Sequence, residues 1–453
     1  MPLVRISRIR IKSTKKLLYI KGAIIMRKSI GVNERPPVPM SLMLGLQHLF
    51  AMFGSTVLVP TILEVDPAIC LLMNGIGTLL YILITKGKIP AYLGSSFAFL
   101  APVTAVINQI NGGSYATALG GFIVVGIIFT IVAFVIQAAG TSWIDVVFPP
   151  AAMGAIIAII GLELIPVAAG MAGWISDGSE GWTMDGKTVL LSTATLLVTV
   201  LGSVLFRGFM RIIPILFGII FGYVLAIIMK MTSFAGIADV SFFKGPTLTF
   251  PQFHLASIIP IAFAALVVIA EHIGHLVVTS NIVGKDLSKD PGLHRSMLGN
   301  GISTILSGFF GSTPNTTYGE NIGVLAITRV YSTFVIGLAA IIAIALSFLG
   351  KFSWLISNIP PAVMGGVSLL LFGVIAASGF RMLVESKVDY SKPTNLFLTT
   401  VVLVVGLSGV AVPLGSSSLT GMSLATVVAI VLSLLFKLFD VLKASNDYEE
   451  TEH

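Results

Sequence analysis

Long apolar runs, separated by short polar stretches, follow one another along nearly the whole chain. A helix needs about twenty apolar residues to cross a bilayer, so each such run predicts one membrane-spanning segment. The third and tenth runs are short and rich in Gly, Pro and Ser, which predicts interrupted helices. Fourteen spans are predicted, near residues 41–63, 68–85, 90–107, 115–139, 146–168, 188–206, 209–229, 254–283, 292–310, 314–328, 330–350, 360–380, 394–412 and 420–441.

Composition agrees with this pattern. Of the 453 residues, 55% are hydrophobic and only 10% are charged, whereas an average soluble domain is about 25% charged. A soluble protein of this length could not cover its surface with so few charges. The chain is therefore predicted to be an all-α polytopic membrane protein.

The distribution of positive charge predicts the orientation. If the N-terminus is inside and the spans alternate, most of the 27 Lys and Arg residues fall on the inner side. Cytoplasmic loops carry such an excess, so we expect both termini in the cytoplasm and the chain in the inner membrane. The net charge of +7 is explained in this way without a nucleic-acid partner. The predicted outer side holds only Lys187, Lys230, Lys244 and Lys351.

The first 35 residues form a basic tail with no signal-peptide cleavage site. Its apolar piece is too short to span a membrane. Met26 begins a stretch that could be an alternative start. Residues 1–25 are therefore either a cytoplasmic extension or a start-site misassignment.

Two sequence motifs occur once in each half of the chain. The stretch NGIGT at 74–78 recurs as NGIST at 300–304, and PPAAMG at 149–154 recurs as PPAVMG at 360–365. The two interrupted spans also occupy matching places. Because seven spans per half is an odd number, the halves must run in opposite directions across the membrane. Inverted repeats with paired interrupted helices are typical of secondary transporters, whose site lies near the midplane.

Two carboxylates lie inside apolar segments, at Glu271 and Glu320. An acidic residue at the centre of a membrane helix costs roughly 2.5–3.5 kcal/mol, so it usually faces a cavity and serves transport. The breaks at 94–97 and 317–320 leave backbone N–H groups free at new helix starts. Carboxylate acceptors, amide donors and the aromatic rings of Phe97 and Tyr318 together favour a flat, neutral ligand such as uracil. A purely structural role for either glutamate is the alternative.

His275 follows Glu271 by four residues, so the two side chains share one helical face. Histidine titrates near neutral pH, and the pair therefore suggests proton coupling through His275 and Glu271. A histidine packed at a helix interface is the alternative. The stretch EHIGH lacks the two histidines of the HExxH zinc motif, so we expect no metal site and no cofactor.

The segment from Glu320 to Arg329, ENIGVLAITR, resembles the signature of the nucleobase–ascorbate (nucleobase–cation symporter 2) transporter family. The pair Gln47-His48 resembles the first-span motif of that family, and the likeness extends from about residue 30 to residue 443. Within the family, the stretches IPAYLGSSFAF, AEHIGHLVVT and GSTPNTTYGENIGV are most similar to the bacterial uracil permeases.

This resemblance implies fourteen spans in two intertwined inverted repeats, with short extended stretches in spans three and ten. It also implies a substrate-holding core domain and a facing gate domain that often forms a dimer contact. The implied division is a basic tail at 1–35, the core at 36–145 and 254–352, the gate at 146–253 and 353–443, and an acidic cytoplasmic tail at 444–453.

The resemblance further implies how a bound base would be held. Glu271 and Glu320 would accept the ring N–H groups, and the backbone at Phe97 and Gly319 would donate to the carbonyls. His275 would take part in proton coupling. Further residues expected to line the pocket are Ser55, Ser96, Tyr318 and Phe372, the last apolar where some relatives carry a tyrosine.

These observations predict a proton-coupled uracil importer that works by alternating access, with uracil, protons and membrane lipid as its partners. A xanthine or purine carrier of the same family is the nearest alternative. A channel is less consistent with a lone pair of carboxylates and paired broken helices. We expect no enzyme, because the sequence contains no nucleophile–base triad, metal cluster or phosphate loop.

Overall fold

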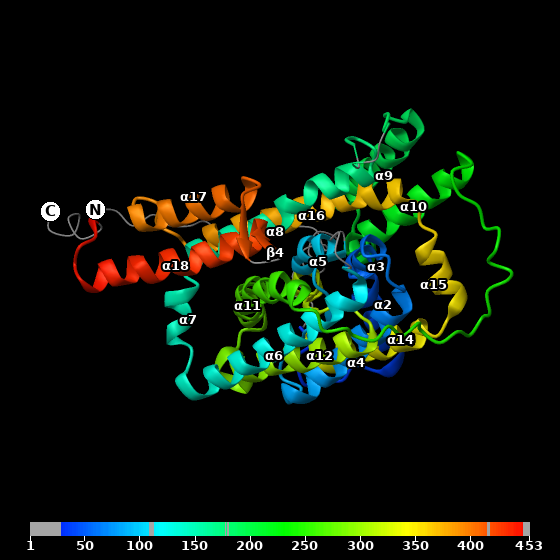
Figure 1. Cartoon of the computed structure of the whole chain (residues 1–453). Coiled ribbons are helices and arrows are strands. Elements are labelled where there is room, and N and C mark those ends of the chain that lie inside the picture. The colour runs from blue at the N-terminus through cyan, green and yellow to red at the C-terminus, as the bar shows by residue number, and fades with distance from the viewer. Residues whose placement is uncertain (1–28, 108–112, 177, 179–180, 415–416, 447–453) are drawn as a thin grey trace, which may run out of the picture.

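The computed structural model describes residues 29–107, 113–176, 178, 181–414 and 417–446. Most of the predicted basic tail and the end of the acidic tail lie outside these ranges. The described chain is mostly helical (Figure 1). Its longer N-terminal elements are α2 (Val38–Ala51), α3 (Phe53–Ile62), α4 (Pro67–Ile84), α5 (Leu100–Ile107), α6 (Tyr115–Ala139), α8 (Pro150–Met171), α9 (Gly186–Leu205) and α10 (Pro214–Ile228).

The second half repeats this succession of elements. It begins with the longest described helix, α11 (Leu255–Val283). The others are α12 (Leu293–Phe310), α13 (Gly319–Thr328), α14 (Thr333–Ser347), α16 (Pro361–Glu385), α17 (Pro393–Leu407) and α18 (Gly421–Val441).

Each predicted span has a helical counterpart, but the counterparts differ in length and hydropathy. Seven described helices are long and apolar enough to cross a membrane, and the bent pair α2–α3 makes up to eight. Four further apolar helical segments are shorter: Phe97–Ile107, α10, α14 and α17. The chain is thus a multi-pass membrane protein, while the count of fourteen crossings stays a prediction.

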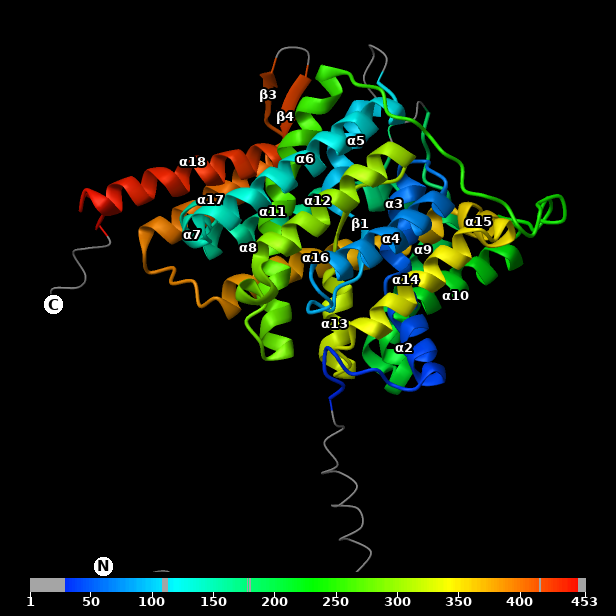
Figure 2. The ribbon, with the colours of Figure 1, turned by 90° about the horizontal axis from the view of Figure 1, so that it is seen from below.

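The helices form two layers with α11 between them (Figure 1). We call α4, α6, α12 and α14 the first layer, and α8, α9, α10, α16, α17 and α18 the second layer. Helix α11 packs on α6 from the first layer and on α8 and α18 from the second. The turned view in Figure 2 shows α13 and α2 on the same side of the molecule, where they contact each other.

The inverted repeat predicted from the sequence is confirmed in the fold. The NGIxT motifs lie on α4 and α12, which pack against each other. The PPAxMG motifs begin α8 and α16, each with a proline in the first turn, where its missing N–H costs nothing. These two helices also pack together, with small residues such as Gly154 and Gly379 at the contact. Equivalent elements of the two halves are therefore neighbours.

The sequence did not predict several short elements. Two short helices, α7 (Ser142–Val147) and α15 (Gly350–Ser357), connect the layers. The predicted span at 394–412 ends earlier, because α17 stops at Leu407 and Gly409 follows with a φ of 73°. The chain then forms an antiparallel hairpin from β3 (Ala411–Leu414) and β4 (Ser417–Thr420).

Candidate functional site

Two short strands from opposite halves of the chain meet inside the membrane-spanning body. β1 (Leu93–Ser95) pairs antiparallel with β2 (Asn315–Thr317), and every residue of both strands is buried. A helical segment follows each strand, from Phe97 in the first half and from Gly319 in the second. Both expected helix breaks thus carry extended stretches. The first backbone N–H groups of a helical segment have no intrahelical acceptor, so each of these segment starts can donate to a ligand.

The repeated NGIxT motif holds these strands. The last residue of each copy, Thr78 or Thr304, bonds the backbone of the strand in its own half. The Leu93 amide donates to Thr78 Oγ1 at 2.9 Å, and Thr304 Oγ1 donates to the Asn315 carbonyl at 3.1 Å. The Asn315 side chain also donates to Ser303 Oγ at 2.7 Å. The motif therefore recurs because each half must anchor its own strand.

Tyr318 has a packing role at the sheet. Its side chain is only 3% exposed. The ring lies against Gly94, where any side-chain carbon would overlap it, and its hydroxyl donates to the Ser95 carbonyl at 2.9 Å. Tyr318 thus contributes mainly to the wall behind the site.

Glu271 and Glu320 come together from different elements. Glu271 lies in the middle of α11, and Glu320 lies in the first turn of α13. Their carboxyl groups interact electrostatically. Within the described residues, Glu271 Oε2 and Glu320 Oε1 are buried and have no hydrogen-bond partner. Buried polar atoms in proteins nearly always have partners, so these two oxygens are candidates to bind a donor from a ligand.

Glu163, a third carboxylate in an apolar segment, has a hydrogen-bond partner. Glu163 on α8 accepts a hydrogen bond at 3.0 Å from the Met422 amide, which belongs to the first turn of α18. Its oxygen therefore satisfies a helix start that would otherwise lack a partner. The contrast shows that burial alone does not leave a carboxylate unpaired in this fold.

His275 lies beside Thr317 and Gly319, at the start of α13. It lies one turn beyond Glu271 on α11, and its Nδ1 is 3.2 Å from Thr317 Oγ1. Its Nε2 faces the start of α13, where a Cβ at Gly319 would be 3.3 Å away. The expected residues Glu271, His275, Gly319 and Glu320 are thus neighbours around the start of α13.

Phe97 and Phe372 form an aromatic contact between the segment after β1 and α16 of the second layer. Phe97 begins the helical segment after β1, and its ring meets the ring of Phe372 on α16 edge to face, with centroids 5.7 Å apart. Both rings are buried. The hydroxyl of Ser96 is buried without a partner among the described residues. Ser55 instead donates to the Met52 carbonyl of its own segment at 3.1 Å.

Several residues beside the site were not singled out for a role at the site by the sequence. Asn321, next to Glu320, accepts from the Tyr92 amide at 3.4 Å and donates to His48 Nδ1 at 2.9 Å. Asn321 therefore ties the start of α13 to the backbone of Tyr92 and to His48. Thr317 was also not singled out, and only its place beside the break could have pointed to it.

The loop between α11 and α12 carries a charge cluster at the molecular surface. Lys88 and Asp290 form an exposed ion pair at 2.6 Å, and Lys289 pairs with Asp286 at 3.0 Å. The Ser288 hydroxyl, together with Lys289, lowers the pKa of Asp286 below its usual value. Exposed pairs of this kind contribute little to stability, so we regard the cluster as a solvated surface feature.

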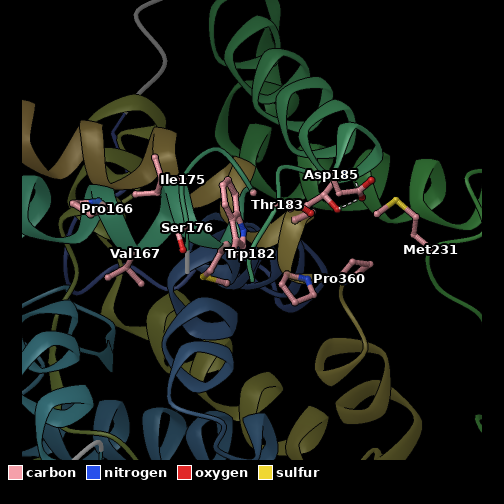
Figure 3. A pocket seen from close by; sticks show the side chains of 15 residues that line it. Pro166, Val167, Ile175, Ser176, Trp182, Thr183, Asp185, Met231 and Pro360 are labelled. Atoms are coloured by element: carbon pink, nitrogen blue, oxygen red, sulfur yellow. Dashed lines mark hydrogen bonds between the residues drawn. The ribbon is translucent and has the colours of Figure 1, made fainter. Parts of the chain in front are cut away.

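A separate pocket of about 760 Å³ lies in the second layer (Figure 3). Trp182, Asp185 and Pro360 line it, with residues from the end of α8. Pro361 at its edge precedes Phe372 by about 16 Å along α16. None of the residues expected at the substrate site lines this pocket, so it is distinct from the carboxylate pair.

Comparison with known proteins covers most of the chain and agrees with this description. Residues 40–415 match a protein family described as "Permease family". The chain belongs to the nucleobase–ascorbate transporter family. It is 61% identical over 419 residues to the "Uracil permease" of Paenibacillus larvae subsp. larvae, covering 92% of this chain and 99% of that protein.

A further relative supports family membership, and a solved structure supports the fold. The "Uracil permease" of Escherichia coli (strain K12) is 61% identical over 417 residues, with 92% of this chain and 96% of that protein covered. The solved structure of SLC26A9 superposes with a TM-score of 0.67 at 12% sequence identity, covering 97% of this chain and 73% of that one. At this low identity the structural likeness concerns the fold alone. Members of the nucleobase–ascorbate transporter family are transporters, and this chain is not an enzyme.

Proposed function

We propose that this protein imports uracil across the inner membrane by proton symport. The observation that carries the proposal is the pair of buried carboxylate oxygens, on Glu271 and Glu320, that have no partner among the described residues beside the start of α13. Uracil has two ring N–H groups for those acceptors and two carbonyl oxygens for backbone amides. The names of the two relatives that are 61% identical support the same substrate.

The backbone at Phe97 and Gly319 supplies the donors in this proposal. Both residues stand at the start of helical segments, where amide groups lack intrahelical partners and the helix dipole is positive. The rings of Phe97 and Phe372 would cover the face of the base. Ser96, with its unpartnered buried hydroxyl, would add a polar contact at the edge, and Ser55 and Tyr318 would support the wall.

Proton coupling would involve His275 and Glu271. They share a face of α11, and His275 also lies against Gly319. A proton taken up on this pair with the substrate, and released with it on the other side, would drive import along an inward proton gradient. Histidine suits this role because its unperturbed pKa lies near neutral pH.

Alternating access would arise from movement between the two layers. We propose that residues 36–145 and 254–352 form the moving core domain, and residues 146–253 and 353–443 form the gate domain. The contact between Phe97 and Phe372 would then join core to gate. The gate domain would also carry the contact of a homodimer, and both termini would face the cytoplasm.

Uptake of radiolabelled uracil into vesicles containing the purified protein tests this function. We expect saturable uptake that requires an inward proton gradient and stops when an uncoupler is added. Uptake that follows a sodium gradient without dependence on pH would refute proton symport. Stronger competition by xanthine than by unlabelled uracil would indicate a purine carrier, and non-saturable flux would indicate a channel.

A further inference from the structure

A chain of buried side chains runs from His275 away from the site. Thr317 Oγ1 lies 3.2 Å from His275 Nδ1 and 3.3 Å from His272 Nδ1. His272 Nε2 lies 2.8 Å from Ser296 Oγ. Ser296 Oγ in turn lies 2.6 Å from the hydroxyl of Tyr81. The chain thus links α11, β2, α12 and α4 without interruption.

Only one direction of the hydrogen bond between Tyr81 and Ser296 leaves no O–H donor unused. Tyr81 is completely buried, and within the described residues Ser296 is the only partner of its hydroxyl. An O–H that donates to nothing in a buried place is costly, whereas an unused lone pair on the same oxygen matters less. Tyr81 therefore donates to Ser296.

The direction of this hydrogen bond then determines the direction of each following hydrogen bond. Ser296 has accepted one bond and gives its own proton to His272 Nε2. With Nε2 accepting, neutral His272 carries its proton on Nδ1 and donates to Thr317. Thr317 donates its hydroxyl proton to His275 Nδ1. Neutral His275 is then left with its proton on Nε2, the nitrogen that faces Gly319.

We propose that Tyr81 sets the tautomer of His275 through Ser296, His272 and Thr317, so that the site always meets an Nε2–H donor. These four residues are positioning residues, because none of them is needed to touch the substrate. The inference deepens the proposed function, since it assigns the polarity of the histidine in that same site. It predicts that the group facing His275 in the loaded site is an acceptor.

No carboxylate, Lys or Arg side chain is a member of this hydrogen-bonded chain. Its five members are hydroxyl and imidazole groups only. The acidic groups of the same site are Glu271 on the helix of His275 and Glu320 in the first turn of α13, and neither is a member of the hydrogen-bonded chain. His48 is held by Asn321.

The protein offers two matched pairs of variants, each with one residue of the hydrogen-bonded chain and one control. Tyr81→Phe removes the terminal donor and keeps the ring, while Tyr92→Phe removes a buried hydroxyl that has no partner within the described residues. Thr317→Val removes the bridge between the histidines. Thr316→Val changes the neighbouring strand residue, whose buried hydroxyl also lacks a partner there. In each pair the same atoms are lost, but only one member belongs to the hydrogen-bonded chain.

The direct test is nitrogen NMR on the full-length protein in lipid, with ¹⁵N-labelled histidine. The sequence has six histidines, and the His275 signals are assigned by their loss in His275→Gln. In the unmodified protein we expect Nε2 protonated and Nδ1 unprotonated. Tyr81→Phe and Thr317→Val should each produce a population with Nδ1 protonated, and the two controls should not. A protonated Nδ1 in the unmodified protein, or an unchanged spectrum in both test variants, overturns the proposal.

Uracil binding gives a second, separate readout. Losing the fixed donor should weaken binding roughly two- to tenfold in Tyr81→Phe, the range for one hydrogen bond, with affinity retained in Tyr92→Phe. Normal uracil binding by Tyr81→Phe with an unchanged His275 spectrum would refute the relay and leave the transport function standing. The expected spectra in a protein that does not bind uracil would refute the substrate and leave the relay standing.

Discussion

The ring of Tyr318 lies directly against the α-carbon of Gly94, and its hydroxyl donates to the neighbouring Ser95 carbonyl at 2.9 Å. Residue 94 comes from the first half of the chain and residue 318 from the second. The two are neighbours because β1 and β2 pair at this place, with Gly94 opposite Thr316. Tyr318 therefore stabilises the pairing of β1 and β2, which positions the starts of the helical segments at Phe97 and Gly319.

Gly94→Ala should destabilise the protein, because its Cβ would overlap the ring of Tyr318. Overpacking of this kind typically costs about 1–3 kcal/mol, which should appear as a lower thermal unfolding midpoint in detergent. Gly337→Ala is the control, since its Cβ would meet neighbours only at 3.9 Å. Equal midpoints for the two variants would contradict the close packing at Gly94. Adding Tyr318→Ala should make the two losses less than additive.

Glu271→Gln and Glu320→Gln should each weaken uracil binding strongly. Both replace a carboxylate acceptor by a neutral amide, and hydrogen bonds to charged groups contribute about 1.5–3 kcal/mol, or roughly ten- to 150-fold in affinity. Equilibrium binding of radiolabelled uracil measures the effect. Glu163→Gln should retain binding, because its oxygen serves the start of α18. The site assignment fails if both test variants bind uracil like the unmodified protein.

Asn321→Ala should lower stability without acting on the substrate directly. It leaves His48 Nδ1 and the Tyr92 amide without their partner, and an unsatisfied buried group costs about 1–3 kcal/mol. Thermal unfolding of Asn321→Ala, His48→Leu and the double variant measures the coupling. We expect the double variant to lose less than the sum of the single losses. Strict additivity would show that the contact between Asn321 and His48 contributes nothing.

Phe372→Leu should change substrate preference. It removes an edge-to-face contact with Phe97, worth about 0.5–1.5 kcal/mol, and leaves more room above the base. Competition of xanthine against radiolabelled uracil should therefore increase relative to the unmodified protein. Phe129→Leu is the control, because Phe129 is equally buried on α6. A similar change in competition for both variants would show a general loss of packing and refute a role in selectivity.

The sequence predicted the large features of this fold because they depend on composition and spacing. Apolar runs located the helices, and the short Gly-, Pro- and Ser-rich runs at 90–107 and 314–328 located both helix breaks. The strands at these breaks were implied only by the family resemblance. Glu271 and Glu320 stood out because a carboxylate is rare in an apolar run. In the same way, the repeated motifs indicated the inverted repeat before any contact was known.

Partners that depend on side-chain direction could not be predicted in the same way. Tyr81 and Ser296 are 215 residues apart in the chain, and each is an ordinary residue for a helix. Nothing in the sequence around His272 indicates its partners, yet it bonds both Ser296 and Thr317. The hairpin at 411–420 was missed because its first residues, AVPL, continue the apolar run of α17.

The pairing of β1 with β2 also constrains how the protein is made. Leu93 emerges from the ribosome more than two hundred residues before its partner Thr317. Before the second half is synthesised, β1 has no partner strand, and lipid cannot form hydrogen bonds with its backbone groups. Neighbouring helices or the insertion machinery must therefore shield β1 until β2 is in place. Biosynthesis of this transporter is completed when its two halves meet, because neither one alone contains a finished site.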